Sequence, residues 1–255
     1  MQHKEIKRIL VSQPEPTNQR SPYFRLAEEY GVEFVFRPLF SIQPIGLRPL
    51  RDQKVDPLGY TGVILTSRTI TDHFFTQLKE QRIELPATMR YYCASEVIAG
   101  YLQKYIQVRK RRVYVPETNG SHDELMELIL KKKKELYLLP SVENQTENIS
   151  PFLEEKGYSV TKYLVSRMVY DTFDEAYIKG FDMVVFFSPN GVHSLYSNIP
   201  GFTPGEGQVF GCLGEGAKAA LVEAGLEVEV FAPRPGVPSL TAALELYLKE
   251  ECSEE

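Results

Sequence analysis

The sequence predicts an α/β fold with two doubly wound parallel-sheet domains of similar topology. Apolar runs of strand length alternate with longer amphipathic runs along the 255-residue chain, which is the pattern of βαβ units. The second half of the chain repeats the order of patterns in the first half, which indicates a duplicated α/β unit. A hydrophobic content of 43% and a charged content of 25% are ordinary for a globular protein.

The pattern of the N-terminal segment is repeated near the middle of the sequence. "RILVSQPEPTNQRSPYFRLAEEYGVEFVFRPL" at the start and "LYLLPSVENQTENISPFLEEKGYSVTKYLV" at 136–165 each predict a strand, a polar turn, a helix and a second strand. Each helix has Pro near its first turn and Gly just past its last turn, which are favourable positions for these two residues. The signals are Ser21–Pro22 with Gly31, and Ser150–Pro151 with Gly157.

Three more segments of the first half have partners in the second half. Residues 63–77 and 184–198 each predict a buried strand, a serine turn and a helix with aromatic residues. The next pair predicts a strand, a cysteine, a turn of small residues, a glutamate and an Ala-rich helix. The last pair predicts a short strand that ends in Pro, then an amphipathic helix. These two pairs are 89–105 with 208–225, and 112–130 with 229–248. From this periodicity alone we expect tandem halves that meet near residue 134.

Ligands of doubly wound sheets bind beyond the carboxyl ends of the strands, where helices begin. Free N–H groups and a partial positive charge make helix N-termini suitable for anions. A serine or threonine in one such turn is explained by helix capping alone, but a whole set of these turns favours a ligand with many carboxylates or phosphates. The turns are Ser12–Gln13, Thr66–Ser67–Arg68, Ala94–Ser95, Ser188–Pro189–Asn190, Gly214–Glu215–Gly216 and Pro238–Ser239.

Several classes of site are excluded by missing motifs. The turn after the first strand has no glycine, which argues against a dinucleotide, and neither a phosphate-binding loop nor a nucleophile elbow occurs. In "GCLGEGAK" the lysine lies inside the helix and no Ser or Thr follows it. The histidines and cysteines have no metal-binding or CxxC spacing, so we expect no metal and reduced thiols. These residues are His3, His73, His122, His193, Cys93, Cys212 and Cys252.

Charge and hydropathy argue against nucleic acid and membrane partners. The net charge is −5, and the basic runs at 109–112 and 131–134 are expected to be solvated faces, with a local patch for a polyanion as the alternative. No run reaches the roughly 20 apolar residues of a membrane span. The start of the chain lacks the apolar core of a signal peptide, so cytoplasmic localisation is expected.

At this point the residues resemble a known family. "FFSPNGVHSLY", "GCLGEGAKAALVEAGLEV", "APRPGVPSLTAALELYL" and "SRMVYDT" together resemble the uroporphyrinogen-III synthases, and "ILVSQPEP" with "VILTSRTITDHFF" is similar to a bacterial form of that family. The resemblance runs in order over essentially the whole chain. It implies that the chain leaves its first domain, completes a second, and returns, with a cleft between the two. Applied here, the domains are 1–38 with 172–255, and 43–168, joined by extended linkers at 39–42 and 169–171.

The resemblance also implies an activity. The substrate would be hydroxymethylbilane, a linear tetrapyrrole with eight carboxylates, which fits the anion-binding turns. The enzyme would cyclise and dehydrate it with inversion of ring D through a spiro intermediate, chiefly by selecting one closure geometry. No cofactor is implied. A monomer is expected, with direct transfer of substrate from hydroxymethylbilane synthase, and with neither nucleic acid nor membrane as partner.

Candidate site residues follow from the family motifs. Tyr170 in "RMVYDT" matches the proton donor to the leaving hydroxyl of ring A, since a phenol is protonated at neutral pH. Ser188 matches a serine of the cleft, beside Asn190 and Gly191. Other substrate-binding candidates are Thr66, Ser67, Arg68, Ser95, Gly214, Gly216, Lys218 and Ser239.

Two departures from the family pattern remove side-chain donors. Gly216–Ala217 stands where the family has a threonine pair, and Ser12–Gln13–Pro14 stands where it has Thr-Arg-Pro. Carboxylate binding at these turns would therefore depend on backbone N–H groups. The departures leave open a non-catalytic two-domain protein that binds tetrapyrroles or other anions. A receptor of the periplasmic type is disfavoured by the missing signal peptide.

Overall fold

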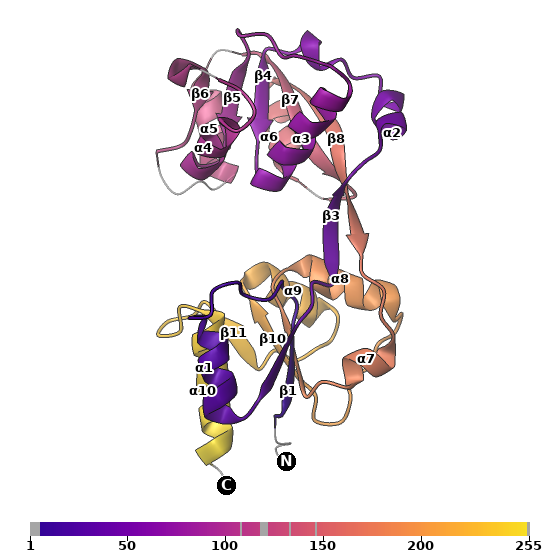
Figure 1. The fold of residues 1–255 in the computed structure, drawn as a ribbon, viewed down its shortest axis with the longest axis vertical. Coiled ribbons are helices and arrows are strands. Elements are labelled where there is room, and N and C mark those ends of the chain that lie inside the picture. Colours follow the sequence, from indigo (N-terminus) through magenta and orange to yellow (C-terminus); the bar gives the residue numbers. More distant parts are fainter. Residues whose placement is uncertain (1–5, 108, 118–121, 133, 146, 254–255) are drawn as a thin grey trace. The chain divides into compact units, whose positions relative to one another are not determined.

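The computed structural model describes residues 6–107, 109–117, 122–132, 134–145 and 147–253. Of the residues singled out above, His3 and Lys133 lie outside these ranges. Contacts divide the chain into two compact units (Figure 1). Unit 1 is the chain up to Ser41 together with the chain from Tyr170 onward, and unit 2 is Ile42–Val169.

Unit 1 is a five-stranded sheet with strand order β11-β10-β9-β1-β2, and each of its strand pairs is parallel. Successive residues of each strand alternate between two apolar cores, as a sheet covered on both faces requires. Its strands are β1 (Arg8–Val11), β2 (Glu33–Phe36), β9 (Met183–Phe186), β10 (Val209–Leu213) and β11 (Val230–Ala232).

Helices cover both faces of the unit 1 sheet. One core joins Ile9 and Val11 of β1 to α1 and α10, which lie side by side (Figure 1). The other joins Leu10 of the same strand to α7, α8 and α9. The helices are α1 (Pro22–Tyr30), α7 (Glu175–Lys179), α8 (Pro189–Asn198), α9 (Glu215–Glu223) and α10 (Leu240–Ser253).

Unit 2 has a six-stranded sheet with strand order β3-β8-β7-β4-β5-β6 around one apolar core. Strands β8, β7, β4, β5 and β6 pair in parallel. They are β3 (Phe40–Pro44), β4 (Gly62–Leu65), β5 (Arg90–Cys93), β6 (Val113–Tyr114), β7 (Leu136–Glu143) and β8 (Ser159–Tyr170). The helices are α2 (Leu47–Asp52), α3 (Arg68–Glu80), α4 (Glu96–Leu102), α5 (His122–Leu130) and α6 (Ile149–Glu155), with short 3-10 turns at Pro57–Gly59 and Lys110–Arg112.

The two sheets confirm the repeat that the sequence indicates. The order β11-β10-β9-β1-β2 of unit 1 corresponds strand by strand to β6-β5-β4-β7-β8 of unit 2, with β3 added at the edge. The helix ends predicted at Gly31 and Gly157 are also observed, because these glycines adopt left-handed φ values of 64° and 75°. The division into tandem halves near residue 134 is wrong, because β7 follows that point and still belongs to the sheet of β4.

The chain enters and leaves unit 2 through segments that the units hold firmly at both ends. In unit 1, Asn198 Nδ2 donates to Asp171 O at 2.8 Å, and Asp171 N donates to Leu39 O at 2.9 Å. In unit 2, Gln77 Nε2 donates to Ile45 O at 2.9 Å and to Val165 O at 2.7 Å. Side chains of α8 and α3 therefore fix the incoming and outgoing segments together.

Two predictions about the rest of the chain can be compared with the structure. Cys93 and Cys212 are free thiols in β5 and β10 with no exposed surface. Burial raises the pKa of Cys93 to about 12 and that of Cys212 to about 11, so both stay protonated and unreactive at neutral pH. Among the described residues, no helix is both long enough and apolar enough to cross a membrane.

Candidate active site

Three turns at the carboxyl end of the unit 1 sheet form one continuous surface. Ser12, after β1, accepts a hydrogen bond on Oγ from Phe187 N at 3.0 Å. A Cβ on Gly191 of α8 would lie 3.1 Å from Phe186 Cδ1 and 3.5 Å from that same Oγ, and a Cβ on Gly216 of α9 would lie 3.3 Å from Pro189 Cγ. Glycine at both positions therefore lets the first turns of α8 and α9 lie close to each other and to β1.

Ser188 differs from the other serines that begin helices. Ser67, Ser95 and Ser239 each accept a hydrogen bond from the backbone N–H three residues on, at 3.2, 3.4 and 3.2 Å. Capping therefore explains these three hydroxyls. Ser188 begins α8 without such a bond, is half-buried, and its hydroxyl has no hydrogen-bond partner among the described residues. This hydroxyl is available to a ligand.

The N-termini of α8 and α9 supply further donors on this surface. Asn190 is half-buried and its amide has no partner among the described residues. Gly214 adopts φ 82°, a value that favours glycine, and leads into α9, whose first N–H groups have no partner inside the helix. Lys218 lies one turn further, with Nζ 4.3 Å from the centre of the Phe231 ring. This face is therefore rich in hydrogen-bond donors.

Gly216 and Ala217, which stand in place of the threonine pair of the family, offer no side-chain donor. The Ala217 side chain is buried in the core between α9 and the sheet, so in this position it presents nothing to a ligand. Gly216 is exposed and has no side chain. Neither residue therefore offers a side-chain donor at this turn, where the donors are backbone N–H groups.

Unit 2 has a cavity of about 390 Å³ at the carboxyl ends of β4 and β7. Thr66 and Ser67 line it, and the half-buried Thr66 hydroxyl has no partner among the described residues. The turn after β7 supplies polar groups that sequence reasoning did not single out, although "SVENQTENIS" is visibly polar. From this turn come Gln145, Glu147 and Asn148, and Ser141 of β7 and His122 at the start of α5 complete the polar lining.

Glu147 is compatible with an anionic ligand in this cavity because its charge is already neutralised. Lys162 Nζ lies 2.7 Å from its carboxylate, and the Ser150 backbone N–H donates to it at 3.0 Å. Burial acts to raise the pKa of Glu147, but the bonds from Lys162 and Ser150 outweigh it and lower the pKa overall.

Two candidates from the sequence do not line the unit 2 cavity. Arg68 is exposed in the first turn of α3, with its guanidinium carbon 6.0 Å from the centre of the Tyr101 ring. Ser95 caps α4. Thr66 and Ser67 both line the cavity, whereas neither Arg68 nor Ser95 is among its described lining residues.

Tyr170 is the last residue of β8, and its exposed phenol, at 36% relative exposure, has no partner among the described residues. The backbone beside it is fixed. Asp171 accepts from Arg37 Nε at 2.7 Å on its carboxylate, and Ser194 Oγ of α8 donates at 2.6 Å to Leu39 O, the acceptor of Asp171 N. Ser194 follows Ser188 by less than two helical turns, or about 9 Å. A free phenol on a fixed backbone suits a proton donor.

Comparison with known proteins adds independent evidence. The family model described as uroporphyrinogen-III synthase HemD matches residues 21–242. A mutant uroporphyrinogen III synthase from the extremely thermophilic bacterium Thermus thermophilus is 16% identical, with 98% of this chain and 100% of that chain covered and a TM-score of 0.59. The uroporphyrinogen-III synthetase of Helicobacter pylori is 17% identical, with 96% and 99% covered and a TM-score of 0.59. Among curated proteins none matches the chain significantly.

The two kinds of comparison establish different things. At such low identity, the solved structures show that the α/β fold is shared. The family model spans most of the sequence, including both serine turns and Tyr170. The chain belongs to the uroporphyrinogen-III synthase family, and its activity is that of a uroporphyrinogen-III synthase.

Proposed function

We propose that the turns at the carboxyl end of the unit 1 sheet bind carboxylates of hydroxymethylbilane, that the unit 2 cavity is suited to carboxylates in its own right, and that Tyr170 donates the proton that releases the hydroxyl of the substrate. The observation that carries the proposal is the Ser188 hydroxyl, which begins a helix but does not cap it. Unpaired donors at helix N-termini favour carboxylates over neutral groups. The unit 2 cavity contributes Thr66 and the amides of Gln145 and Asn148.

The reaction needs a proton for the leaving hydroxyl and a substrate conformation in which the substituted carbon of ring D attacks. The C–O bond at ring A breaks toward oxygen, Tyr170 supplies a proton, and water leaves. The cation that remains is attacked by ring D through its substituted carbon, which gives the spiro intermediate. This reopens and closes with ring D inverted, and the proton lost when the pyrrole re-forms balances the proton that was donated. Residues that hold carboxylates fix which carbon attacks, which is catalysis by orientation.

Product analysis tests the proposal directly. Freshly made hydroxymethylbilane is added to the purified protein, the products are oxidised, and the isomers are separated by chromatography. Isomer III is expected to predominate over a control without protein. If isomer I forms at the spontaneous rate, this chain binds tetrapyrroles or other anions without turnover.

Replacement of the serine by alanine is expected to affect stability in one serine turn and substrate binding in the other. Ser67→Ala removes a cap and is expected to lower the free energy of unfolding by about 1 kcal/mol. Ser188→Ala removes no internal bond, so it is expected to leave stability within about 0.5 kcal/mol while raising KM about tenfold, the cost of one hydrogen bond to a charged group. Urea unfolding and steady-state kinetics measure the two quantities. Equal loss of stability in both variants would contradict this assignment of the Ser188 hydroxyl.

We further propose that the chain acts in the cytoplasm as a monomer and receives hydroxymethylbilane directly from hydroxymethylbilane synthase. The support is chemical, because a substrate that closes spontaneously is lost during free diffusion. In a coupled assay, direct transfer predicts a fraction of isomer III that is insensitive to dilution of both enzymes. A fraction that falls on dilution would show that the substrate diffuses freely.

A further inference from the structure

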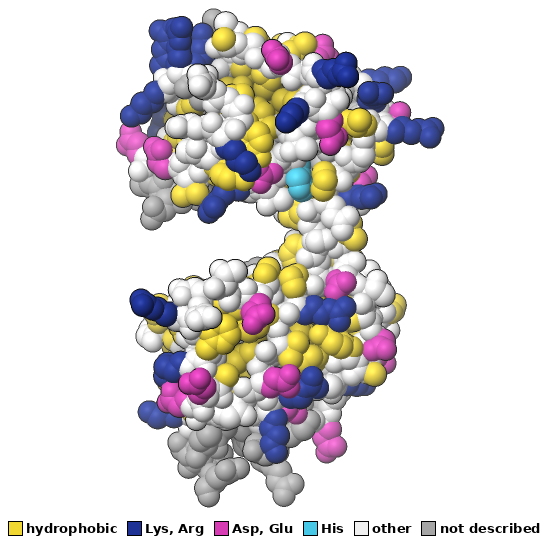
Figure 2. Space-filling model, viewed as in Figure 1, with side chains coloured by type: hydrophobic (Ala, Val, Ile, Leu, Met, Phe, Trp, Pro, Cys, Tyr) yellow, Lys and Arg dark blue, Asp and Glu magenta, His cyan; other side chains and the backbone are white. Residues whose placement is uncertain are grey.

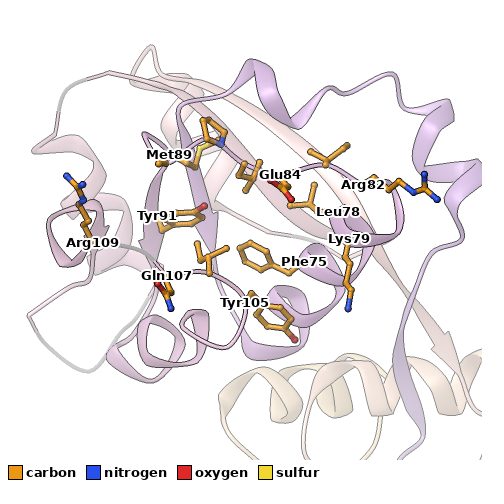
Figure 3. Close-up of a pocket in the computed structure, with 15 residues that line it drawn as sticks. Phe75, Leu78, Lys79, Arg82, Glu84, Met89, Tyr91, Tyr105, Gln107 and Arg109 are labelled. Atoms are coloured by element: carbon orange, nitrogen blue, oxygen red, sulfur yellow. The ribbon is translucent and has the colours of Figure 1, made fainter.

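Unit 2 contains a second and larger cavity, of about 700 Å³, that the proposed reaction does not use. Its walls come from the end of α3, the loop that leads into β5 and the segment after α4 (Figure 3). It lies at the amino end of β5, whereas Thr66 and Ser67 lie at the carboxyl end of β4, so the two cavities occupy opposite ends of the sheet. Its volume is within the range of small-molecule sites.

Aromatic rings form the inner wall of this cavity. Phe75 stacks on Tyr105 with ring centres 5.0 Å apart, and Tyr91 lies 6.4 Å from Phe75. The three rings lie around the centre of Figure 3, with Leu78 and Met89 beside them. On the face of unit 2 seen in Figure 2, hydrophobic side chains gather between α3 and α4, with Lys and Arg side chains around them. An apolar ring would find partners here.

The matching positions of unit 1 provide a comparison for this cavity. Tyr196 occupies in α8 the place of Phe75 in α3, eight residues after the first serine, and Phe210 is the second residue of β10 as Tyr91 is of β5. In unit 1, Phe202 from the intervening loop packs against both rings, at 6.2 Å from Tyr196 and 6.3 Å from Phe210.

In the described part of unit 2, Phe75 stacks on Tyr105 from the segment after α4, and the loop that corresponds to the loop of Phe202 supplies no ring. Phe202 is only 5% exposed and fills its site, whereas the corresponding loop of unit 2, "QRIELPATM" at 81–89, has no aromatic residue. This loop instead packs Ile83 and Leu85 against the core, and the cavity stays open beside Phe75 and Tyr91, whose ring centres are 6.4 Å apart. The loop of unit 1 therefore contributes an aromatic ring of its own, whereas the corresponding loop of unit 2 contributes none.

Cations surround the mouth of the cavity. Lys79, Arg82 and Arg109 line it, and none of their charged groups has a partner among the described residues. Figure 3 shows them extending outward around the rim, which leaves the entrance open. Glu84 is the one acidic residue of the lining. The surplus of positive charge favours a ligand with an acidic group.

Arg82 occupies a position where glycine would fold more easily. Its N–H donates to Lys79 O at 3.0 Å, and the next N–H donates to Leu78 O at 2.9 Å. Gly157 and Gly225 end α6 and α9 with the same pair of bonds. Arg82 has φ 56°, so its side chain is retained at a cost of about 1 kcal/mol relative to glycine. This helix end places the Arg82 side chain at the rim of the cavity.

We propose that this cavity binds a small aromatic acid, whose ring lies against the aromatic inner wall and whose anionic group is bound by Arg82 and Lys79. The site is separate from the tetrapyrrole-binding turns. Its ligand class is one or two fused or linked rings with a carboxylate, sulfonate or phosphate at one end. The half-buried Tyr105 and the apolar lining provide the apolar contact, and the guanidinium provides the charge-assisted bond.

Fluorescence titration with anilinonaphthalene sulfonate, an aromatic anion, tests the proposal in the full-length protein. Saturable binding at one site is expected. Arg82→Gly keeps the left-handed helix end and is expected to weaken binding about tenfold, while the thermal midpoint stays equal or rises. Lys54→Gly is the matched control, since Lys54 is also a cation at a left-handed helix end of unit 2, with φ 53°, but lies outside the cavity. It is expected to bind as the parent does.

A second pair of variants fills the cavity. Ile83→Phe and Ala87→Phe each place a ring in the loop that corresponds to the loop of Phe202, and at least one is expected to abolish binding in a protein that still unfolds cooperatively. If all cavity variants bind the probe as the parent does, the probe binds elsewhere and the proposal fails. If uncharged phenylnaphthylamine binds as tightly as the sulfonate, and Arg82→Gly has no effect, the acidic ligand class is wrong.

Discussion

Tyr170→Phe is expected to lower kcat for formation of isomer III about 100-fold, the lower end of the range for loss of a general acid. The substitution removes only the phenol oxygen, which has no partner among the described residues. The free energy of unfolding should therefore stay within about 0.5 kcal/mol of the parent. KM should change little, because the ring remains and the turns proposed to bind carboxylates are untouched. Steady-state kinetics with separation of the two isomers measures the effect.

The matched control is Tyr60→Phe. Tyr60 lies just before β4 at the amino end of the unit 2 sheet, and its hydroxyl likewise has no partner among the described residues. This variant should keep full activity. A Tyr170→Phe enzyme that retains more than about a third of the parental kcat would assign the proton to water, since loss of a general acid costs far more than that.

The repeated architecture could be predicted because its signals are local. The apolar run of β9, the serine at 188 and the amphipathic pattern of α8 are all contained in one short stretch, and the same holds for β4, Ser67 and α3. Pro22 begins α1, and Gly31 ends it in the left-handed conformation that favours glycine. Such features depend on neighbours along the chain, so the sequence shows them directly.

The different roles of the serines could not be predicted in this way. Ser67 and Ser188 occupy equivalent turns with similar backbone angles, φ −153° and −160°, yet only Ser67 caps its helix. Whether the hydroxyl turns to its own helix depends on the rotamer and on the packing of neighbouring turns, here those of Ser12 and Gly216. The polar groups of Gln145 and Asn148 were missed for a related reason, since only the tertiary fold brings the turn after β7 beside Thr66.

Gln77 is the residue whose role the sequence conceals most completely. In the sequence it is one polar position of the amphipathic helix α3, but its side chain is 1% exposed. Its Nε2 donates to the backbone oxygens of both segments that carry the chain into and out of unit 2, at Ile45 and Val165. Those acceptors belong to β8 and to the residue after β3, far from α3 in sequence. A helical pattern cannot show which side chain will meet them.

Gln77→Glu is expected to lower the free energy of unfolding by about 3 kcal/mol at neutral pH, because a buried oxygen would replace the donor that faces two carbonyls. The matched control is Gln81→Glu one turn later, where the side chain is half-buried and donates to Tyr163 Oη at 3.2 Å and, at the longer distance of 3.3 Å, to Gln77 O. It should cost less than about 1 kcal/mol, the value of one ordinary hydrogen bond. Urea unfolding of both variants measures the difference.

The pH dependence of the Gln77→Glu variant gives the sharper test. Burial against two carbonyls would raise the folded-state pKa of the new carboxyl above its unfolded value of about 4.3. A raised pKa means that stability is fully present below the unfolded pKa and is lost as pH rises through the folded pKa. The protonated acid restores a donor, so the deficit relative to the parent should shrink between neutral pH and about pH 5. A deficit that is constant with pH would show that Gln77 fills space in the core rather than binding the two segments.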